Sequence, residues 1–174
     1  LPLPIRSRLG LGYLTQEASI FRDLTVKDNI DLALKNSSYS RAAIRNRREE
    51  LINEFNLNNF VDSYGYQLSG GERRRCEIAR ALSVGRKGPK YLLLDEPFAG
   101  IDPLAVNDLK KLILKLSNAG VGILITDHNV RETLLITNKS YVLSEGKILA
   151  NGSSSELADN PIVKKYYLGD RSEE

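Results

Sequence analysis

The sequence lacks any apolar run near the roughly 20 residues that a helix needs to cross a bilayer. No signal-peptide pattern is visible either. It has a single cysteine, Cys76, so no disulfide can form within the chain, and a reducing compartment is indicated. We expect Cys76 to lie in a helix as a small buried hydrophobic side chain. Within these 174 residues, a membrane-spanning segment and a disulfide-stapled fold are excluded.

Strong charge of one sign is also missing. The net charge of +3 is too small to indicate nucleic-acid binding. The basic runs Arg45 to Arg48 and Arg73 to Arg75 are typical of solvated helix faces. With 41% hydrophobic and 27% charged residues, the composition suits one globular domain, or most of one, with a core of its own.

The first residues are unusual for a protein start. Leu1 is not a methionine, and Leu1-Pro2-Leu3-Pro4 is typical of a loop within a protein. We therefore expect the chain to begin inside a longer protein.

Capping residues predict where helices begin. Thr25 precedes an acid at Asp28, Ser40 precedes a helix to about Phe55, and Ser69 with Glu72 forms a capping box. The third of these helices is expected to stop near Gly85. Asp102 followed by Pro103 predicts another, which Gly120 ends.

Short apolar runs predict strands. The stretches at residues 12–14, 91–94 and 121–126 read as strands, and the last two as strands buried on both faces of a parallel sheet. The strand–helix–strand order of residues 91–126 makes one βαβ unit. Residues 141–150 predict an antiparallel hairpin, and a final helix is expected from Ser155 to Leu168. The fold class is α/β with a parallel sheet.

The acidic pair Asp95-Glu96 ends a predicted buried strand, where open α/β sheets place their ligands. Asp95 there can hold Mg²⁺ through water. Glu96 points differently and suits a general base that polarises an attacking water. The alternative is a solvated acidic turn.

A predicted helix begins directly after Leu68 with the sequence Ser69-Gly70-Gly71. The free amides at its start and its dipole favour binding of an anion. The glycines let the backbone approach a phosphate closely. An ordinary capped helix is the alternative.

Two polar residues follow other predicted strands. His128, the only histidine, lies just past the strand that ends at Thr126, so a phosphate contact competes with a structural hydrogen bond. Gln16 follows the first strand, and its amide can bridge Mg²⁺ and the attacking water.

The order of these motifs resembles the ABC ATPase family over essentially the whole chain, as Q-loop, signature, Walker B, D-loop and H-loop. The resemblance implies a P-loop-NTPase-like fold, truncated at its N-terminus. Its implied parts are a helical signature subdomain at about residues 17–85, RecA-like core elements at about 90–150 and a C-terminal helix at 151–174. The motifs are, in order, Gln16, Leu68 to Glu72, Leu92 to Glu96, Asp102 and His128.

A closer resemblance is to the ATPase subunits of lipopolysaccharide-export transporters. Branched-chain amino-acid importers share much of the pattern and remain an alternative. Thr15 stands where a proline is usual and Cys76 where a valine is usual, and neither affects the chemistry. The similar segments are residues 12–22, 68–75, 96–102 and 126–133, with Tyr167-Leu168-Gly169 at the end.

That resemblance implies a role for each site residue. It implies ATP and Mg²⁺ as cofactors, a homodimer of ATPase subunits, two membrane permease subunits and no nucleic acid. It also implies a cytoplasmic location, peripheral on the inner (plasma) membrane. By the resemblance, Asp95 and Gln16 help to bind Mg²⁺, Glu96 is the catalytic base and His128 contacts the γ-phosphate. Gln16 also couples the nucleotide to the membrane subunits. The residues that contact ATP are Ser69, Gly70, Gly71 and Asp102, and those that dock the permeases are Phe21 and Arg22. Simple core packing is the alternative for Phe21.

One motif of the family is absent. The pattern G-x-x-x-x-G-K-[ST] occurs nowhere, and Gly146-Lys147 is followed by Ile148. Because that loop supplies most of the phosphate affinity, we expect the chain alone to bind ATP weakly and to be inactive. The remaining readings are an inert ABC fragment that acts as an interaction module and a soluble ABC ATPase of DNA repair or translation.

Overall fold

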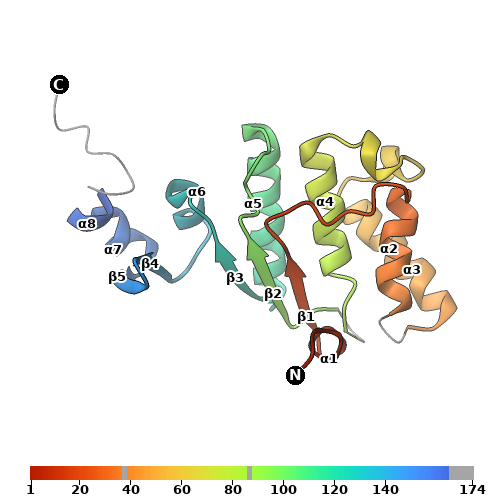
Figure 1. The fold of residues 1–174 in the computed structure, drawn as a ribbon, viewed down its shortest axis with the longest axis horizontal. Coiled ribbons are helices and arrows are strands. Elements are labelled where there is room, and N and C mark those ends of the chain that lie inside the picture. Colours follow the sequence, from red (N-terminus) through yellow and green to blue (C-terminus); the bar gives the residue numbers. More distant parts are fainter. Residues whose placement is uncertain (37–38, 86–87, 165–174) are drawn as a thin grey trace. The chain divides into compact units, whose positions relative to one another are not determined.

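The computed structural model describes residues 1–36, 39–85 and 88–164. Within it the chain forms two compact units, residues 1–126 and 127–174 (Figure 1). In the described ranges, no helix is both long and apolar enough to cross a membrane.

A three-stranded parallel sheet is the centre of the first unit. Its strands are β1 (Leu11–Leu14), β2 (Tyr91–Asp95) and β3 (Gly122–Thr126), in the order β1-β2-β3. All three strands agree with the sequence-based prediction, and so does the parallel pairing of β2 with β3. Because parallel strands end at the same edge, the last residues of β1, β2 and β3 lie at one edge of the sheet.

The two faces of this sheet differ in exposure. On one face Leu14, Leu92 and Leu94 are buried. On the other, Tyr91 and Leu124 are each more than 60% exposed. The prediction that residues 91–94 and 121–126 form strands buried on both faces is therefore wrong, because in the described residues one face of β2 and β3 is left open.

Two helices contact the outer strands of the sheet. Helix α4 (Gly70–Ala81) contacts β1, and helix α5 (Pro103–Asn118) contacts β3. Asp102 caps α5 as predicted, because its carboxylate accepts from the amides of Leu104 and Ala105. At Gly12 a side chain would collide with the carbonyl of Ala81, so the end of α4 lies directly on β1. Helix α4 ends at Ala81, before the predicted end near Gly85.

A helical layer continues beyond α4, as Figure 1 shows on the side away from the strands. It consists of α2 (Val26–Lys35) and α3 (Arg41–Glu54), followed by the 3-10 turns η1 (Asn58–Phe60) and η2 (Gly65–Gln67). Helix α2 packs against both α3 and α4. The predicted caps Thr25 and Ser40 are confirmed, since their hydroxyls accept from the amides of Asp28 and Ala43.

The start of the chain differs from the predicted loop. Residues Leu3–Arg8 form the helix α1. Pro4 does not prevent this, because the first turn of a helix has free amides and a proline there loses no hydrogen bond.

The second unit contains a hairpin and short helices. The predicted hairpin is confirmed, and its apolar core consists of Val142, Ala150, Leu157 and Val163. Its elements are α6 (Val130–Leu134), β4 (Ser140–Ser144), β5 (Lys147–Gly152), α7 (Ser154–Asp159) and α8 (Pro161–Val163).

The single final helix predicted from Ser155 to Leu168 is wrong in its described part. Asn160 is extended and caps α8, because Pro161 disfavours a helical residue before it. Residues 165–168 and the Tyr167-Leu168-Gly169 segment lie outside the described residues.

Candidate active site

The acidic pair lies where β2 ends. Asp95 is the last residue of the strand, and Glu96 follows with a left-handed backbone (φ 45°). The amide of Glu96 donates to the carbonyl of Thr126 at 2.7 Å, which ties this turn to the end of β3. Both residues are partly exposed, and the backbone of the turn is held in place. The solvated acidic turn considered above therefore stays an alternative.

Hydroxyl groups surround the carboxylate of Asp95. Thr126 donates to one of its oxygens at 2.5 Å, and the Tyr13 hydroxyl lies 3.5 Å from the other, at the limit for a hydrogen bond. These partners come from β3 and β1, the two neighbours of β2. Both partners are neutral hydroxyl groups, and neither is a cation.

The position of Gln16 is fixed through its neighbour. The guanidinium of Arg74, on α4, donates to the carbonyl of Thr15 at 2.9 Å and to that of Glu96 at 2.8 Å. The residue before Gln16 and the acidic pair are therefore at one edge of the sheet. The side chain of Gln16 itself is exposed.

The signature turn has the predicted capping box. The Ser69 amide donates to the Glu72 carboxylate at 2.8 Å, and the Glu72 amide donates to the Ser69 hydroxyl at 3.4 Å. The two glycines of this turn are also required because there is too little space for a side chain, which the sequence did not reveal. A Cβ at Gly71 would lie 2.9 Å from that of Ala105, and one at Gly70 would lie 3.1 Å from the Gly100 carbonyl.

This packing places the signature turn against the start of α5 in the same chain. The Asp102 carboxylate lies 3.8 Å from the position that a Gly71 Cβ would take. The predicted ATP-facing groups Ser69, Gly70, Gly71 and Asp102 therefore form one cluster. Ser69, Gly70 and Asp102 are exposed, so their polar groups are accessible.

The predicted docking residues Phe21 and Arg22 are both exposed, and Phe21 is 45% exposed. Simple core packing does not describe Phe21. The guanidinium of Arg80 lies 4.5 Å from the centre of its ring, a cation–π contact. The exposed rings of Tyr64 and Tyr66 stack on each other close by, where the Tyr66 amide donates to the Arg22 carbonyl.

His128 belongs to the second unit, two residues after Thr126. Its side chain is 74% exposed, and Nδ1 lies 3.9 Å from a carboxylate oxygen of Asp127. The predicted phosphate contact of His128 stays a prediction.

The sequence reading missed Arg74 and Glu77. Arg74 was assigned with its run to a solvated face, but it is only 6% exposed and Glu77 only 3%. A signal existed, because positions 74, 77, 78 and 81 fall on one face of a helix whose other members are apolar. Arg48 is also not a free surface charge, since it pairs with Asp31 on α2 at 2.8 Å.

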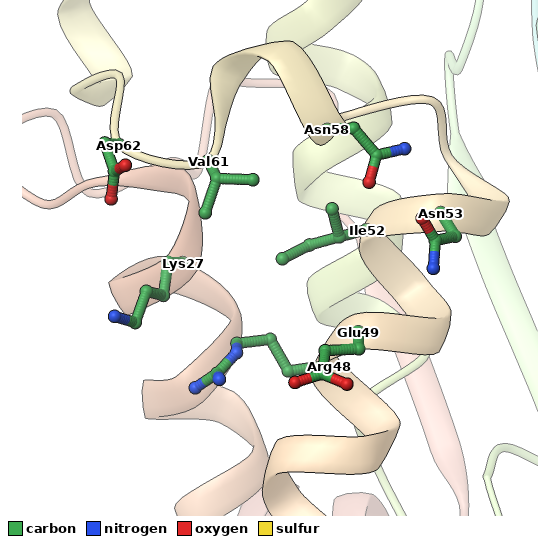
Figure 2. A pocket seen from close by; sticks show the side chains of 8 residues that line it. All are labelled: Lys27, Arg48, Glu49, Ile52, Asn53, Asn58, Val61 and Asp62. Carbon is green, nitrogen blue, oxygen red and sulfur yellow. The ribbon is translucent and has the colours of Figure 1, made fainter.

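A hollow of about 350 Å³ lies in the helical layer, between α2, α3 and the segment after them. Figure 2 shows that its lining mixes charged, amide and apolar side chains. None of the predicted site residues contributes to it. The lining residues are Lys27, Arg48, Glu49, Ile52, Asn53, Asn58, Val61 and Asp62.

The donor set at the sheet edge suits a hard cation held largely through water. In the part of the chain that the structure describes, no cluster of three or more metal-ligating side chains occurs. Asp95 nevertheless offers a carboxylate at this edge. The neighbouring Gln16, whose preceding carbonyl is held by Arg74, could add an amide oxygen. Mg²⁺ binds in this way, through one or two protein oxygens together with water and substrate phosphates.

Comparison with known proteins gives the family. The model of the ABC transporter family matches residues 5–99. The lipopolysaccharide export system ATP-binding protein LptB of Acidithiobacillus ferridurans is 49% identical over 98% of this chain, and that of Escherichia coli K12 is 50% identical. In both cases the chain spans 70% of the relative's length.

Solved structures give the same fold. The ABC transporter component cbiO1 of Clostridium perfringens has a TM-score of 0.78 and 26% identity, over 94% of this chain and 64% of that one. The ATP-binding cassette MJ0796, in a dimeric post-hydrolysis state with ADP and Pi, has a TM-score of 0.74 and 24% identity. It matches over 87% of this chain and 65% of that one. The predicted fold class and the resemblance to lipopolysaccharide-export ATPases are confirmed. The chain belongs to the ABC transporter family and has the fold of its ATP-binding cassettes.

Proposed function

We propose that this chain is the signature and hydrolysis part of an ATPase subunit that powers lipopolysaccharide export. The observation that carries the proposal is the edge of the sheet, where Asp95, Glu96 and the residue before Gln16 are held together. Support for the substrate is the identity of 49–50% to lipopolysaccharide-export ATP-binding proteins over 98% of the chain.

In the proposed reaction, Glu96 accepts a proton from the water that attacks the γ-phosphate of ATP. Asp95 would hold Mg²⁺ through water, and Gln16 would contribute its amide oxygen to the same site. When bound, Mg²⁺ neutralises charge that develops on the phosphates. His128 is proposed to donate to the γ-phosphate.

The signature residues act on ATP held by another subunit in this proposal. The free amides at the start of α4 and the Ser69 hydroxyl face the phosphates of a partner copy in a homodimer, with Asp102 beside them. Phe21 and Arg22 dock two membrane permease subunits. The subunit is then peripheral on the inner membrane, at its cytoplasmic side.

Complementation in Escherichia coli tests the proposal. An N-terminal segment of the Escherichia coli relative that carries the P-loop expected for the family is fused before Leu1. The chimera is expressed in cells depleted of their own LptB. We expect growth with the chimera and none with its Glu96→Gln variant. If the chimera does not support growth when it is expressed at the level of the native subunit, the assignment to lipopolysaccharide export is contradicted. Rescue of a branched-chain amino-acid importer instead assigns the chain to that class.

The purified 174-residue chain tests the expected need for a P-loop. Since the sequence lacks this motif, we expect ATP turnover at background, equal to that of the Glu96→Gln variant. Robust turnover by the unmodified chain would overturn this expectation.

A second candidate function is a non-hydrolysing module that completes the site of an intact partner. The intact capping box at Ser69 favours it, because this part of the site needs no P-loop of its own. The chain is mixed with an intact subunit whose own signature serine is mutated. If hydrolysis is restored, the chain can act as such a module. If hydrolysis is not restored at a saturating concentration of the chain, this function is rejected.

A further inference from the structure

A buried ion pair on α4 joins two segments that are far apart in sequence. Arg74 Nη1 lies 3.2 Å from a carboxylate oxygen of Glu77, and both side chains are almost fully buried. Burying two charges costs more free energy than their attraction returns unless every polar group is hydrogen-bonded. Replacement of a buried ion pair by apolar residues of similar volume is often neutral or stabilising. We therefore look for the role of this pair in the backbone groups that it holds.

Arg74 holds the edge of the sheet on which the carboxylates lie. A guanidinium has five N–H groups, and five acceptors surround this one. Besides Glu77, they are the carbonyl oxygens of Thr15 at 2.9 Å, Asp95 at 3.0 Å, Glu96 at 2.8 Å and Pro97 at 3.4 Å. The left-handed turn at Glu96 is thus fixed from inside by one side chain.

Glu77 holds the segment that leads to Phe21. One of its oxygens accepts from the amides of Ser19 at 2.7 Å and Ile20 at 3.1 Å. Its other oxygen accepts from Arg74. A single carboxylate therefore lies between the exposed segment at Phe21 and Arg22 and the guanidinium that holds Glu96.

We infer that Arg74 and Glu77 are a positioning pair that transmits displacement of residues 19–22 to the backbone of Asp95 and Glu96. This inference rests on the proposed function, because it assigns the link between membrane-partner docking and hydrolysis. A shift of the Ser19 and Ile20 amides moves the Glu77 carboxylate, then the guanidinium, and then the peptide groups that aim the general base. Lysine cannot replace Arg74, because an ammonium has three donors and no planar fork.

Asn29 provides a matched control. It is fully buried on α2, accepts from the Phe21 amide at 3.0 Å and donates to the carbonyls of Phe21, Leu24 and Thr25. It holds the same exposed segment as Glu77 does, but these bonds stay within residues 21–25. Loss of Asn29 therefore loosens the segment without interrupting the path to Glu96.

Amide hydrogen exchange on the 174-residue chain tests the link without any need for ATP. Glu77→Gln keeps the shape and one acceptor oxygen. We expect it to speed exchange at Ser19 and Ile20, and also at Glu96, by about tenfold. Asn29→Ala should speed exchange near Phe21 and leave Glu96 unchanged. An unchanged Glu96 amide in Glu77→Gln, or an equal response in Asn29→Ala, overturns the inference.

Steady-state hydrolysis by the chimera with the Escherichia coli membrane subunits gives a second readout. We expect Arg74→Lys to lower kcat about tenfold with KM for ATP within about twofold, and to reduce the stimulation by the membrane subunits. Asn29→Ala should keep kcat without the membrane subunits. A rise in KM with unchanged kcat overturns the inference.

If Arg74→Lys does not fold, Glu77→Gln takes its place. Absence of hydrolysis by the unsubstituted chimera contradicts the proposed function alone, since the exchange measurement decides the link independently.

Discussion

The amide of Glu96 donates to the carbonyl of Thr126 across 2.7 Å, which holds a non-glycine residue in the left-handed region at the end of β2. A left-handed backbone costs an L-residue about 1–2 kcal/mol. The residue proposed as general base is thus kept in an unfavourable conformation by its neighbours, as is common at functional sites.

We predict that Glu96→Gly raises the free energy of unfolding by about 1 kcal/mol, because glycine adopts this backbone without strain. Urea denaturation of the chain measures it. Glu49→Gly is the control, since Glu49 is an exposed residue inside α3, where glycine costs about 1 kcal/mol. Equal losses of stability in both variants would show that the turn at Glu96 carries no strain.

Ser69→Ala should lower the free energy of unfolding by about 1 kcal/mol, because an amide at the start of α4 loses its cap. Ser40→Ala removes the corresponding cap of α3 and should cost a similar amount. The two variants should differ in the mixing assay with a signature-mutated subunit, where only Ser69→Ala abolishes restored hydrolysis. Equal restoration by both variants would contradict a role for the Ser69 hydroxyl in trans.

Burial raises the pKa of Cys76 from 9.0 to about 12. Because the thiolate is the reactive form, we expect no alkylation of the native chain by iodoacetamide at pH 8, and complete alkylation in urea. Mass spectrometry distinguishes the two. Rapid alkylation of the native chain would show that α4 opens readily.

The same shift gives a pH dependence. The thiol ionises more easily in the unfolded chain, so its contribution to stability is complete below about pH 9 and is lost as the pH rises toward about 12. The loss is about 1.4 kcal/mol per pH unit in that range. Cys76→Val should remove this part of the dependence, so the difference in stability between the two proteins should change above pH 9 and stay constant below it. Parallel curves throughout would contradict the assignment.

Phe21→Ala should change the free energy of unfolding by less than about 1 kcal/mol, because the ring is half exposed. In the proposed function it should nevertheless weaken binding to the membrane subunits. Co-purification with the Escherichia coli membrane subunits measures this. Leu114→Ala on α5, which is 40% exposed, is the matched control and should bind normally.

Much of the fold was predictable because its determinants are local. The caps at Thr25, Ser40, Ser69 and Asp102 each depend on residues within three positions, and all four form as predicted. The parallel sheet followed from the strand–helix–strand order. The acidic pair was found for the same reason, since it ends an apolar run.

The sequence-based predictions that were wrong depend on contacts with residues outside the segment concerned. Exposure of Leu124 depends on whether another layer covers β3, which the strand itself does not encode. Burial of Arg74 depends on carbonyl groups supplied by β2 and by the segment after β1. The end of α7 depends on Pro161, whose local signal was outweighed by the helical spacing around it.

The open face of the sheet sets a condition on how the chain behaves in solution. Tyr13, Tyr91 and Leu124 present apolar surface on adjacent strands. Exposed apolar surface of this kind favours contact with another surface. In solutions of the 174-residue chain, self-association should therefore increase with protein concentration.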